Sequence, residues 1–259
     1  MSIRFLHNSR VIQATTRQSG ILAKMEQQQK QRDLKTQRPQ KQSGGQRSAK
    51  LRGLPSDSPE VKLSKTLSWL LRHGAKNEGL PMRPDGFVRV DDLLENPKIK
   101  AQSVDLPALQ KIVGADAKQR YHFKQEEEIW WIKANQGHSL KTVKLVLKPI
   151  LSVEDIPSRI AVHGTNKEAW KSISTQGLSK MSRNHIHLAQ GVSGENVISG
   201  MRSSSSILIF IDIPSAIASG IQFFLSDNGV ILTEGDSQGF IPPRFFSRVE
   251  SKKGVPVQG

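Results

Sequence analysis

Arginine and histidine side chains recur in short motifs of this chain, in combinations that could hold an anion. Arg72 and His73 are adjacent in LLRHGA, Arg120 lies in KQRYHF, and Arg183 lies in MSRNHIHL. A guanidinium stays charged at neutral pH and can donate two parallel hydrogen bonds to a phosphate or carboxylate. Taken singly, each arginine is explained equally well by a helix C-terminus, where cations are favoured, or by an exposed surface. An anion site therefore requires a fold that brings the motifs together.

Histidines lie in or beside strand-like runs of the second half of the chain. They are His163 in RIAVHGT, His185 and His187 in HIHLA, and, before them, His138 in NQGHS. Alternate residues of a strand share a face, so an HxH pair could bind a metal. No third ligand has suitable spacing and the chain has no cysteine, so we predict no metal site. Histidines that are bonded to the backbone and packed between strands fit this pattern as well as histidines with a binding role.

Most of the positive charge is concentrated at the N-terminus. The chain has a net charge of +15, and residues 1–52 hold 12 Lys/Arg and 2 Asp/Glu, a net of +10. The segment 25–50 is rich in Gln and Lys and has almost no large apolar residues, so it cannot bury enough surface to become ordered. We predict a disordered basic tail over residues 1–58.

The first 24 residues contain four basic residues, several hydroxyl residues and no acid. This composition is typical of a mitochondrial or plastid transit peptide, but it also fits a basic extension that contacts RNA or is trimmed. Both interpretations remain open, so we expect an intracellular protein of the nucleus or cytoplasm, with organelle targeting as the alternative. No apolar run approaches the roughly 18 residues of a membrane helix, and we expect no membrane association.

The elements that must position the cations begin with a helix. Leu63, Leu67, Leu70 and Leu71 are spaced as one apolar face, and the predicted helix ends at the Arg72–His73 pair. An Asp-Gly turn at 85–86, a short strand and two further helical segments follow, and a charged turn then joins two strand-like runs between 119 and 138. Helices followed by a hairpin predict a winged-helix lobe over residues 59–150.

The second half of the chain is strand-rich. Its β-branched and aromatic runs are cut by Gly, Ser, Asn and Asp, and one helix is expected between residues 166 and 178. These patterns predict a second α+β lobe over residues 151–250, followed by a flexible C-terminus over 251–259. The fold class that we predict for the whole chain is therefore α+β.

Eight segments of this chain, taken together, identify a family. In order, they are LSKTLSWLLRHGA, GLPMRPDGFVRVDDLL, KQRYHF, ANQGHS, VHGT, SRNHIHLA, ISGMR and SDNGVILTEG. Together they resemble the RNA (tRNA) 2′-phosphotransferase family over about residues 60–247. The resemblance implies an N-terminal winged-helix lobe that holds RNA and a C-terminal lobe of ADP-ribosyltransferase type that holds NAD.

The resemblance also implies a reaction of two steps that uses NAD as a co-substrate and no metal. The internal 2′-phosphate of a spliced tRNA attacks the nicotinamide ribose of NAD and releases nicotinamide, which leaves an ADP-ribosylated 2′-phospho-RNA intermediate. The ribose 2″-hydroxyl then attacks the phosphorus. The products are RNA with a 2′-hydroxyl and ADP-ribose 1″,2″-cyclic phosphate.

The resemblance carries residue roles over to matching positions. Arg72, His73 and Arg120 would hold the phosphate, and Arg183 would act mainly in the second step. The residues implied for the NAD pocket are His163, Gly164, Thr165 and His187, with Arg202 and Asn228 as weaker candidates. One position departs from the family pattern, because Lys133 replaces the usual arginine before NQGH, and we assign it no catalytic part.

Two other classes of function remain as alternatives. An NAD-independent RNA phosphoesterase would use HGT as half of a paired His-x-Thr site, although HIH lacks the hydroxyl for the other half. A non-catalytic RNA-binding adaptor would use the winged helix and the basic tail only to grip phosphates. We expect a monomer, and the physiological RNA is not specified by these motifs.

Overall fold

The computed structural model describes residues 56–192, 201 and 204–257. The predicted transit peptide and residues 1–55 of the tail predicted over residues 1–58 lie outside the described residues. The described residues bury two large hydrophobic clusters, one within residues 63–134 and the other within residues 150–245. Both clusters combine helices with strands, which confirms the predicted α+β class. No helix of the described part combines the length and apolar character needed to cross a membrane.

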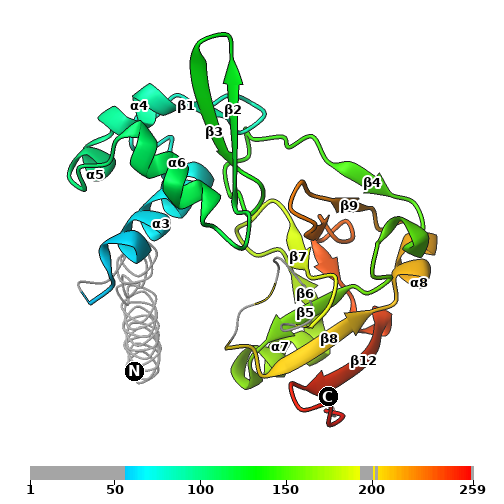
Figure 1. Ribbon diagram of the computed structural model, residues 1–259. Coiled ribbons are helices and arrows are strands. Elements are labelled where there is room, and N and C mark those ends of the chain that lie inside the picture. Colours follow the sequence, from blue (N-terminus) through cyan, green and yellow to red (C-terminus); the bar gives the residue numbers. More distant parts are fainter. Residues whose placement is uncertain (1–55, 193–200, 202–203, 258–259) are drawn as a thin grey trace, which may run out of the picture. The chain divides into compact units, whose positions relative to one another are not determined.

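The first cluster is built mainly from helices (Figure 1). In order, its elements are α3 (Pro59–Trp69), η1 (Leu70–Gly74), β1 (Val88–Arg89), α4 (Val90–Glu95), α5 (Pro97–Lys100), α6 (Leu106–Gly114), β2 (Tyr121–Glu126) and β3 (Ile129–Ala134). Ser58 caps α3 by accepting a hydrogen bond from the backbone N–H of Val61, and a proline occupies the first helical position. The predicted apolar face of this helix is buried, since Leu67 and Leu70 are 0% exposed.

The helix does not end as a regular α-helix. Residues Leu70–Gly74 form a π-helical turn, η1, in which the Ala75 N–H donates to the Leu70 carbonyl, five residues earlier, at 3.0 Å. A π-helical turn inserts one extra residue into the helix and occurs most often at functional sites. The sequence pattern predicted the helix, but it carried no sign of this wider turn, which holds Arg72 and His73.

The predicted hairpin is confirmed. β2 and β3 pair antiparallel from Tyr121 with Ala134 to Glu126 with Ile129, and β1 adds to the other side of β3. The turn consists of Glu127 and Glu128, and Glu127 has a φ of 55°. In Figure 1 the hairpin projects beyond the helices at its turn end.

The second cluster lies among short strands. Its elements are β4 (Lys148–Ile150), η2 (Val153–Asp155), β5 (Val162–Thr165), α7 (Lys167–Gln176), β6 (Leu178–Ser179), β7 (Ile186–Leu188), β8 (Ile207–Ile211), α8 (Ile213–Ala218), β9 (Phe223–Leu225), β10 (Ile231–Thr233), β11 (Phe240–Ile241), η3 (Pro243–Phe245) and β12 (Phe246–Ser251). One sheet has the strand order β4-β9-β10-β7 and another the order β12-β8-β5. Paired bonds between Val162 and Ala189, at 2.9 and 2.8 Å, join β5 to the residue that follows β7. The HGT and HIH motifs are therefore neighbours.

Candidate active site

The loop 135–139, with sequence NQGHS, supports the Arg72–His73 pair. The Ser139 N–H donates to the Arg72 carbonyl at 3.0 Å, and the Ser139 hydroxyl lies 2.9 Å from His73 Nδ1. Burial is the main reason that the pKa of His73 falls to about 4, so the ring is neutral at pH 7. With the hydroxyl donating to Nδ1, the ring proton sits on Nε2. His73 can then donate one hydrogen bond to an anion.

Gly137 lets this loop lie directly against Arg72. Its φ is +92°, and a Cβ atom there would lie 3.3 Å from both Cδ and Nε of Arg72. The Nε and Nη2 atoms of Arg72 are buried and have no hydrogen-bond partner among the described residues. Burial lowers the pKa of this guanidinium to about 10, so it remains charged at neutral pH. Arg72 is therefore a cation held in place by loop 135–139, and its Nε and Nη2 groups are available to donate hydrogen bonds.

Arg120 is oriented by an acid. Its backbone N–H donates to Asp116 Oδ2 at 2.6 Å, its Nη1 donates to Asp116 Oδ1, and the carboxylate side chain is only 6% exposed. Asn135 fixes the same segment by donating to the carbonyls of Arg120 and Gln119 at 2.9 and 2.7 Å. One end of loop 135–139 thus holds Arg120, while the other end holds His73.

The residue after Arg183 binds the same loop. The Asn184 N–H donates to the His138 carbonyl at 2.9 Å, and its side-chain amide donates to the Leu140 carbonyl at 3.0 Å. Burial is the largest cause of the lowered pKa values of Arg72 and His73, and the positive charge of Arg183 lowers both further. The charge of Arg120 also lowers the pKa of Arg72. The structure therefore brings all four predicted phosphate-site residues together.

Two cavities meet at Arg183. One, of about 280 Å³, is lined by residues that include His163, Gly164 and Thr165 together with Arg183 and His187. The other, of about 470 Å³, shares four of these five and extends along α7 to Phe240. The predicted pocket residues of β5 and β7 thus meet Arg183 in one place.

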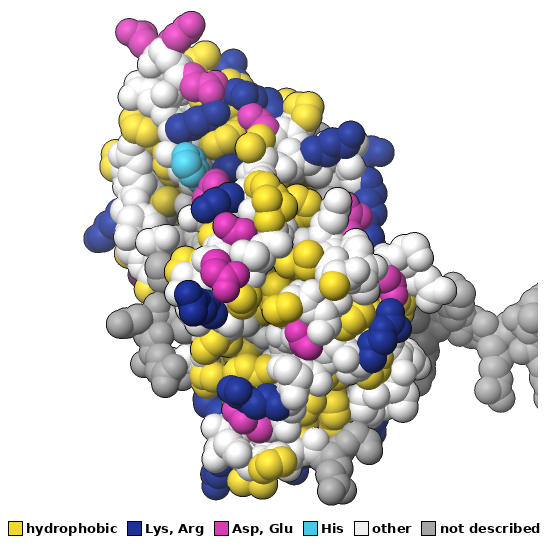
Figure 2. Space-filling view, turned by 90° about the vertical axis from the view of Figure 1, so that its right-hand side faces the viewer, with side chains coloured by type: hydrophobic (Ala, Val, Ile, Leu, Met, Phe, Trp, Pro, Cys, Tyr) yellow, Lys and Arg dark blue, Asp and Glu magenta, His cyan; other side chains and the backbone are white. Residues whose placement is uncertain are grey.

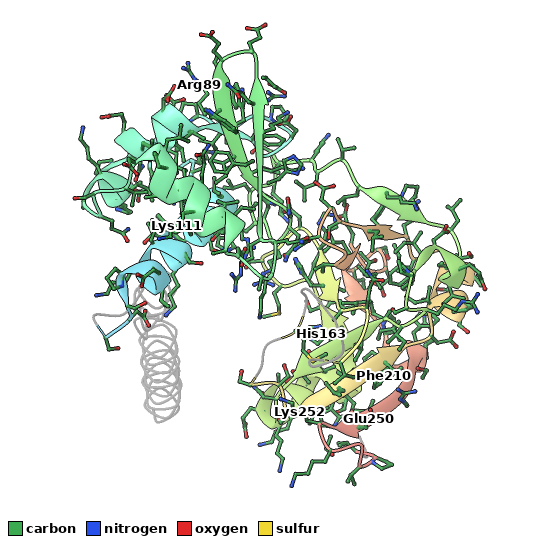
Figure 3. The ribbon with its side chains drawn as sticks, viewed as in Figure 1. Arg89, Lys111, His163, Phe210, Glu250 and Lys252 are labelled. Atoms are coloured by element: carbon green, nitrogen blue, oxygen red, sulfur yellow. The ribbon has the colours of Figure 1, made fainter. Side chains whose placement is uncertain are left out.

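The backbone and the buried histidines shape these cavities. A Cβ atom on Gly164 would lie 2.6 Å from Ser205 Oγ, so the chain after residue 200 packs directly against this glycine. His163 Nδ1 donates to the His187 carbonyl at 3.0 Å, and Figure 3 labels His163 on the same sheet as Phe210 and Glu250. Burial lowers the pKa of His187, and its Nε2 atom has no partner among the described residues. This neutral ring lines both cavities.

Two of the residues singled out from the sequence, Asn228 and Lys133, lie elsewhere, and a third is not described. Asn228 is buried, accepts from Ser226 Oγ at 3.0 Å and donates to the Lys118 carbonyl at 3.1 Å, and it lines neither cavity. Lys133 pairs with Asp227 at 2.9 Å. Arg202 lies outside the described residues. In the described part, no three His, Asp or Glu side chains gather where they could hold a metal ion.

Clustered cations beside two cavities that share lining residues are features of sites that bind phosphorylated ligands. Residues 58–235 match the sequence profile of the RNA 2′-phosphotransferase, Tpt1/KptA family. The chain is 45% identical over 203 residues to tRNA 2′-phosphotransferase 1 of Danio rerio, covering 77% of this chain and 89% of that protein. It is 44% identical over 211 residues to the human protein of the same name, covering 78% and 82%. It is 40% identical over 189 residues to tRNA 2′-phosphotransferase of Saccharomyces cerevisiae, covering 70% and 81%. The chain belongs to the RNA 2′-phosphotransferase family.

Four supporting residues were not predicted to have a role in the site. Asp116 orients Arg120, Gly137 admits Arg72, Ser139 orients His73, and Asn184 ties Arg183 to the loop. The last three lie in segments that carried the family resemblance, ANQGHS and SRNHIHLA, which was the available signal for them. Asp116 gave none, because three residues of irregular chain separate it from Arg120.

Proposed function

We propose that this protein removes the internal 2′-phosphate of spliced tRNA by transferring it to NAD. The products are RNA with a 2′-hydroxyl, nicotinamide and ADP-ribose 1″,2″-cyclic phosphate, formed by way of an ADP-ribosylated 2′-phospho-RNA. The observation that carries the proposal is the convergence of Arg72, His73, Arg120 and Arg183 beside the cavities of β5 and β7. The names of the relatives support the RNA substrate.

The first step needs fixed cations more than a general base. A phosphate monoester is already a nucleophile near neutral pH, and the work of the protein is to hold it in line with the ribose carbon that loses nicotinamide. Arg72 and Arg120 can each grip phosphate oxygens, and neutral His73 can donate from Nε2. A phosphate would also satisfy the buried Nε and Nη2 of Arg72.

The second step places more negative charge on phosphorus. The ribose 2″-oxygen forms a bond to phosphorus, the bond from phosphorus to the RNA 2′-oxygen breaks, and the proton of the 2″-hydroxyl passes to the RNA. Preorganised donors stabilise such a charge most when they are aimed at the transition state. Arg183 is proposed for this role because it lines both cavities, whereas Arg72 and Arg120 line neither.

The residues of the two cavities fit a dinucleotide such as NAD. Cavities of about 280 and 470 Å³ that share a wall are of suitable size for a nucleotide ligand. The Gly164 backbone, which lines the smaller cavity, the His187 Nε2 atom and the apolar side chains of Ile173 and Phe240 offer polar and apolar contacts. We propose that NAD binds there and supplies the carbon that the phosphate attacks.

The two hydrophobic clusters support finer assignments of the lobes. We propose that residues 59–150 form a winged-helix lobe that holds RNA, because a hairpin follows the helices of the first cluster. We propose that residues 151–250 form an ADP-ribosyltransferase-like lobe, because the NAD cavities lie among its strands. A monomer suffices for this reaction, since all four proposed phosphate-site residues belong to one chain.

The test is to incubate the purified protein with a short RNA that carries one internal 2′-phosphate, with and without NAD, in EDTA. We expect loss of the 2′-phosphate only with NAD, accompanied by nicotinamide and the cyclic ADP-ribose phosphate. Release of inorganic phosphate without NAD would instead identify a phosphoesterase. Binding of the RNA with no chemistry under either condition would identify an adaptor.

A further inference from the structure

A third cavity, of about 380 Å³, lies beside the candidate active site and has no part in the reaction described above. We call it the linker cavity, because residues 141–147, between β3 and β4, form one of its walls. Its other walls come from Asn184 and His185, from Phe224 on β9 and from Glu234 after β10. His185 also lines the 470 Å³ cavity, so the two cavities are neighbours.

The linker wall is held in place by specific bonds. The Lys144 N–H donates to the Pro84 carbonyl at 2.8 Å, and the Asn184 amide donates to the carbonyls of Leu140 and Val143 at 3.0 and 3.4 Å. A Cβ atom on Gly86 would lie 3.3 Å from Val143 Cγ1, so the turn at Gly86 packs against the back of this wall. A binding site with fixed walls loses little entropy when a ligand enters.

The side chains of the linker cavity match a nucleotide. Phe224, Leu145 and Leu147 are partly exposed and give an apolar wall with one aromatic ring. Lys141 and Lys144 are exposed at its edge, while Glu234 pairs with Lys180 at 3.2 Å. Burial lowers the pKa of His185, so this ring adds hydrogen-bonding atoms without charge at pH 7. An aromatic face flanked by cations suits a base with its phosphate.

We propose that the linker cavity binds a nucleotide of the RNA strand next to the one that carries the 2′-phosphate. Its base packs on Phe224 and its backbone phosphate lies between Lys141 and Lys144. The inference rests on the proposed function. It depends on the short distance along the chain between Arg183 and the linker cavity, because Asn184 and His185, which line the cavity, directly follow Arg183. A phosphate held by Arg183 and a base in this cavity are then neighbours along one RNA strand.

The experiment measures binding without NAD for a series of RNAs with one internal 2′-phosphate. The shortest is a dinucleotide, and longer members add one nucleotide on the 5′ or the 3′ side. For the wild-type protein we expect one of the two extensions to tighten binding by about tenfold, as stacking on one aromatic residue provides. We also expect the extended RNA to show a steeper salt dependence, by about 0.7 in the log–log slope.

Two variants separate the contributions to that gain. Lys141→Ala/Lys144→Ala should lose the electrostatic part of the gain and return the salt slope to that of the dinucleotide, while dinucleotide affinity is unchanged. Phe224→Leu should lose the stacking part of the gain but keep the steeper slope. The control is Lys98→Ala/Lys100→Ala, which removes equal charge from α5, outside all three cavities, and should keep both effects.

The outcomes distinguish this inference from the proposed function. If the dinucleotide does not bind, both fail. If it binds but neither extension tightens binding, or if the gain survives Lys141→Ala/Lys144→Ala, only the linker-cavity inference is wrong. If the same double variant weakens NAD or dinucleotide binding as much as it weakens the extended RNA, the linker cavity belongs to the active site and the inference is again overturned.

Discussion

At the level of single residues, Arg183 differs from Arg72, His73 and Arg120, because it precedes β7 whereas they belong to the first half of the chain. If it acts mainly when the phosphorus is five-coordinate, Arg183→Ala should slow the second step by about 10²–10³. We expect RNA that carries 2′-phospho-ADP-ribose to accumulate and to appear as a slow-migrating band on a gel. Arg183→Lys should restore part of the second-step rate, since the charge remains but the planar guanidinium with its paired donors is lost.

Arg120→Ala is the matched comparison for Arg183→Ala. Its loss should slow nicotinamide release and leave little of the ADP-ribosylated RNA, because the phosphate is then poorly held in the first step. Equal loss of nicotinamide release in the two variants, with no intermediate in either, would contradict this division of roles.

His138 links the site to the pH dependence of stability. Its side chain is 2% exposed, and burial lowers its pKa to about 3. In the unfolded chain the ring takes up a proton near pH 6.5, so the stabilising contribution is complete above that pH and is lost as the pH falls toward 3. At pH 5 the loss amounts to about 2 kcal/mol.

Urea denaturation at pH 7.5 and pH 5 measures this loss. His138→Gln should reduce the difference in unfolding free energy between the two pH values by about 2 kcal/mol. His122→Gln is the control, because His122 is exposed and should change the difference much less. An unchanged difference in His138→Gln would show that this ring is not held neutral by the fold.

The family resemblance was enough to select the candidate site residues from the sequence, but it did not indicate what holds them in place. Arg72, His73, Arg120 and Arg183 were identified through the resemblance, and the structure places them together. The hydrogen bond from Ser139 to His73 and the contact of Gly137 with Arg72 join residues more than 60 positions apart. No local pattern encodes such pairs, because they depend on how the loop returns to η1.

At the scale of elements, η1 makes Gly74 a sensitive position. A Cβ atom there would lie 2.6 Å from two ring atoms of Trp69, so Gly74→Ala forces the indole to move. Overpacking of this kind costs about 1–3 kcal/mol, and it should also slow turnover, because η1 carries Arg72 and His73. Gly114→Ala at the end of α6 is the control, since nothing lies within 4 Å of its Cβ position and it should be close to neutral. Equal unfolding free energies of the two variants would contradict this account of the turn.

The elements differ in how clearly the sequence predicts them. The hairpin of β2 and β3 was predictable, because alternation and a charged turn are local signals. β12 was not predicted, because its sequence FSRVES mixes charged and apolar residues and becomes a strand only by pairing with β8. The C-terminal stretch predicted as flexible begins at the last residue of β12, and the Val257 N–H donates to the Val249 carbonyl at 3.0 Å. Long-range pairing of this type overrides local propensity.

The hairpin turn also restricts how RNA can bind. Glu126, Glu127 and Glu128 follow one another at the turn, and Arg83 and Lys124 both pair with Glu126. Like charge repels an RNA backbone, so we expect phosphates to avoid this tip. The proposed winged-helix lobe would then contact RNA through the surface around Arg72 and Arg120.

Charge is unevenly divided over the whole molecule. Residues 53–259 carry a net charge of +5, which is what remains of +15 after the +10 of residues 1–52. The face in Figure 2 shows basic and acidic side chains interspersed among apolar ones, with no continuous basic field over its described part. Because residues 1–52 carry +10 of the net charge of +15, we expect the tail to provide most of the sequence-independent attraction for RNA.

Deletion of residues 1–52 tests whether the tail contributes to RNA affinity but not to catalysis. Turnover of a short 2′-phosphorylated RNA at moderate salt should stay close to that of the full chain, and any loss of RNA affinity should come with a shallower salt dependence. The family match begins at residue 58, which supports a catalytic part that excludes the tail. If deletion abolished turnover of the short RNA, the tail would belong to the active site.

We expect the burial of Arg72 to affect the stability of the fold and the activity of the protein in opposite directions. Two of its nitrogen atoms are buried without partners in the described residues, which lowers the stability of the fold, and a bound anion would satisfy them. Arg72→Met, which keeps an unbranched chain of similar length, should therefore abolish phosphate transfer yet raise the unfolding free energy by about 1 kcal/mol. Selection for thermostability alone would then favour loss of this arginine, and only a screen that also demands activity would retain it.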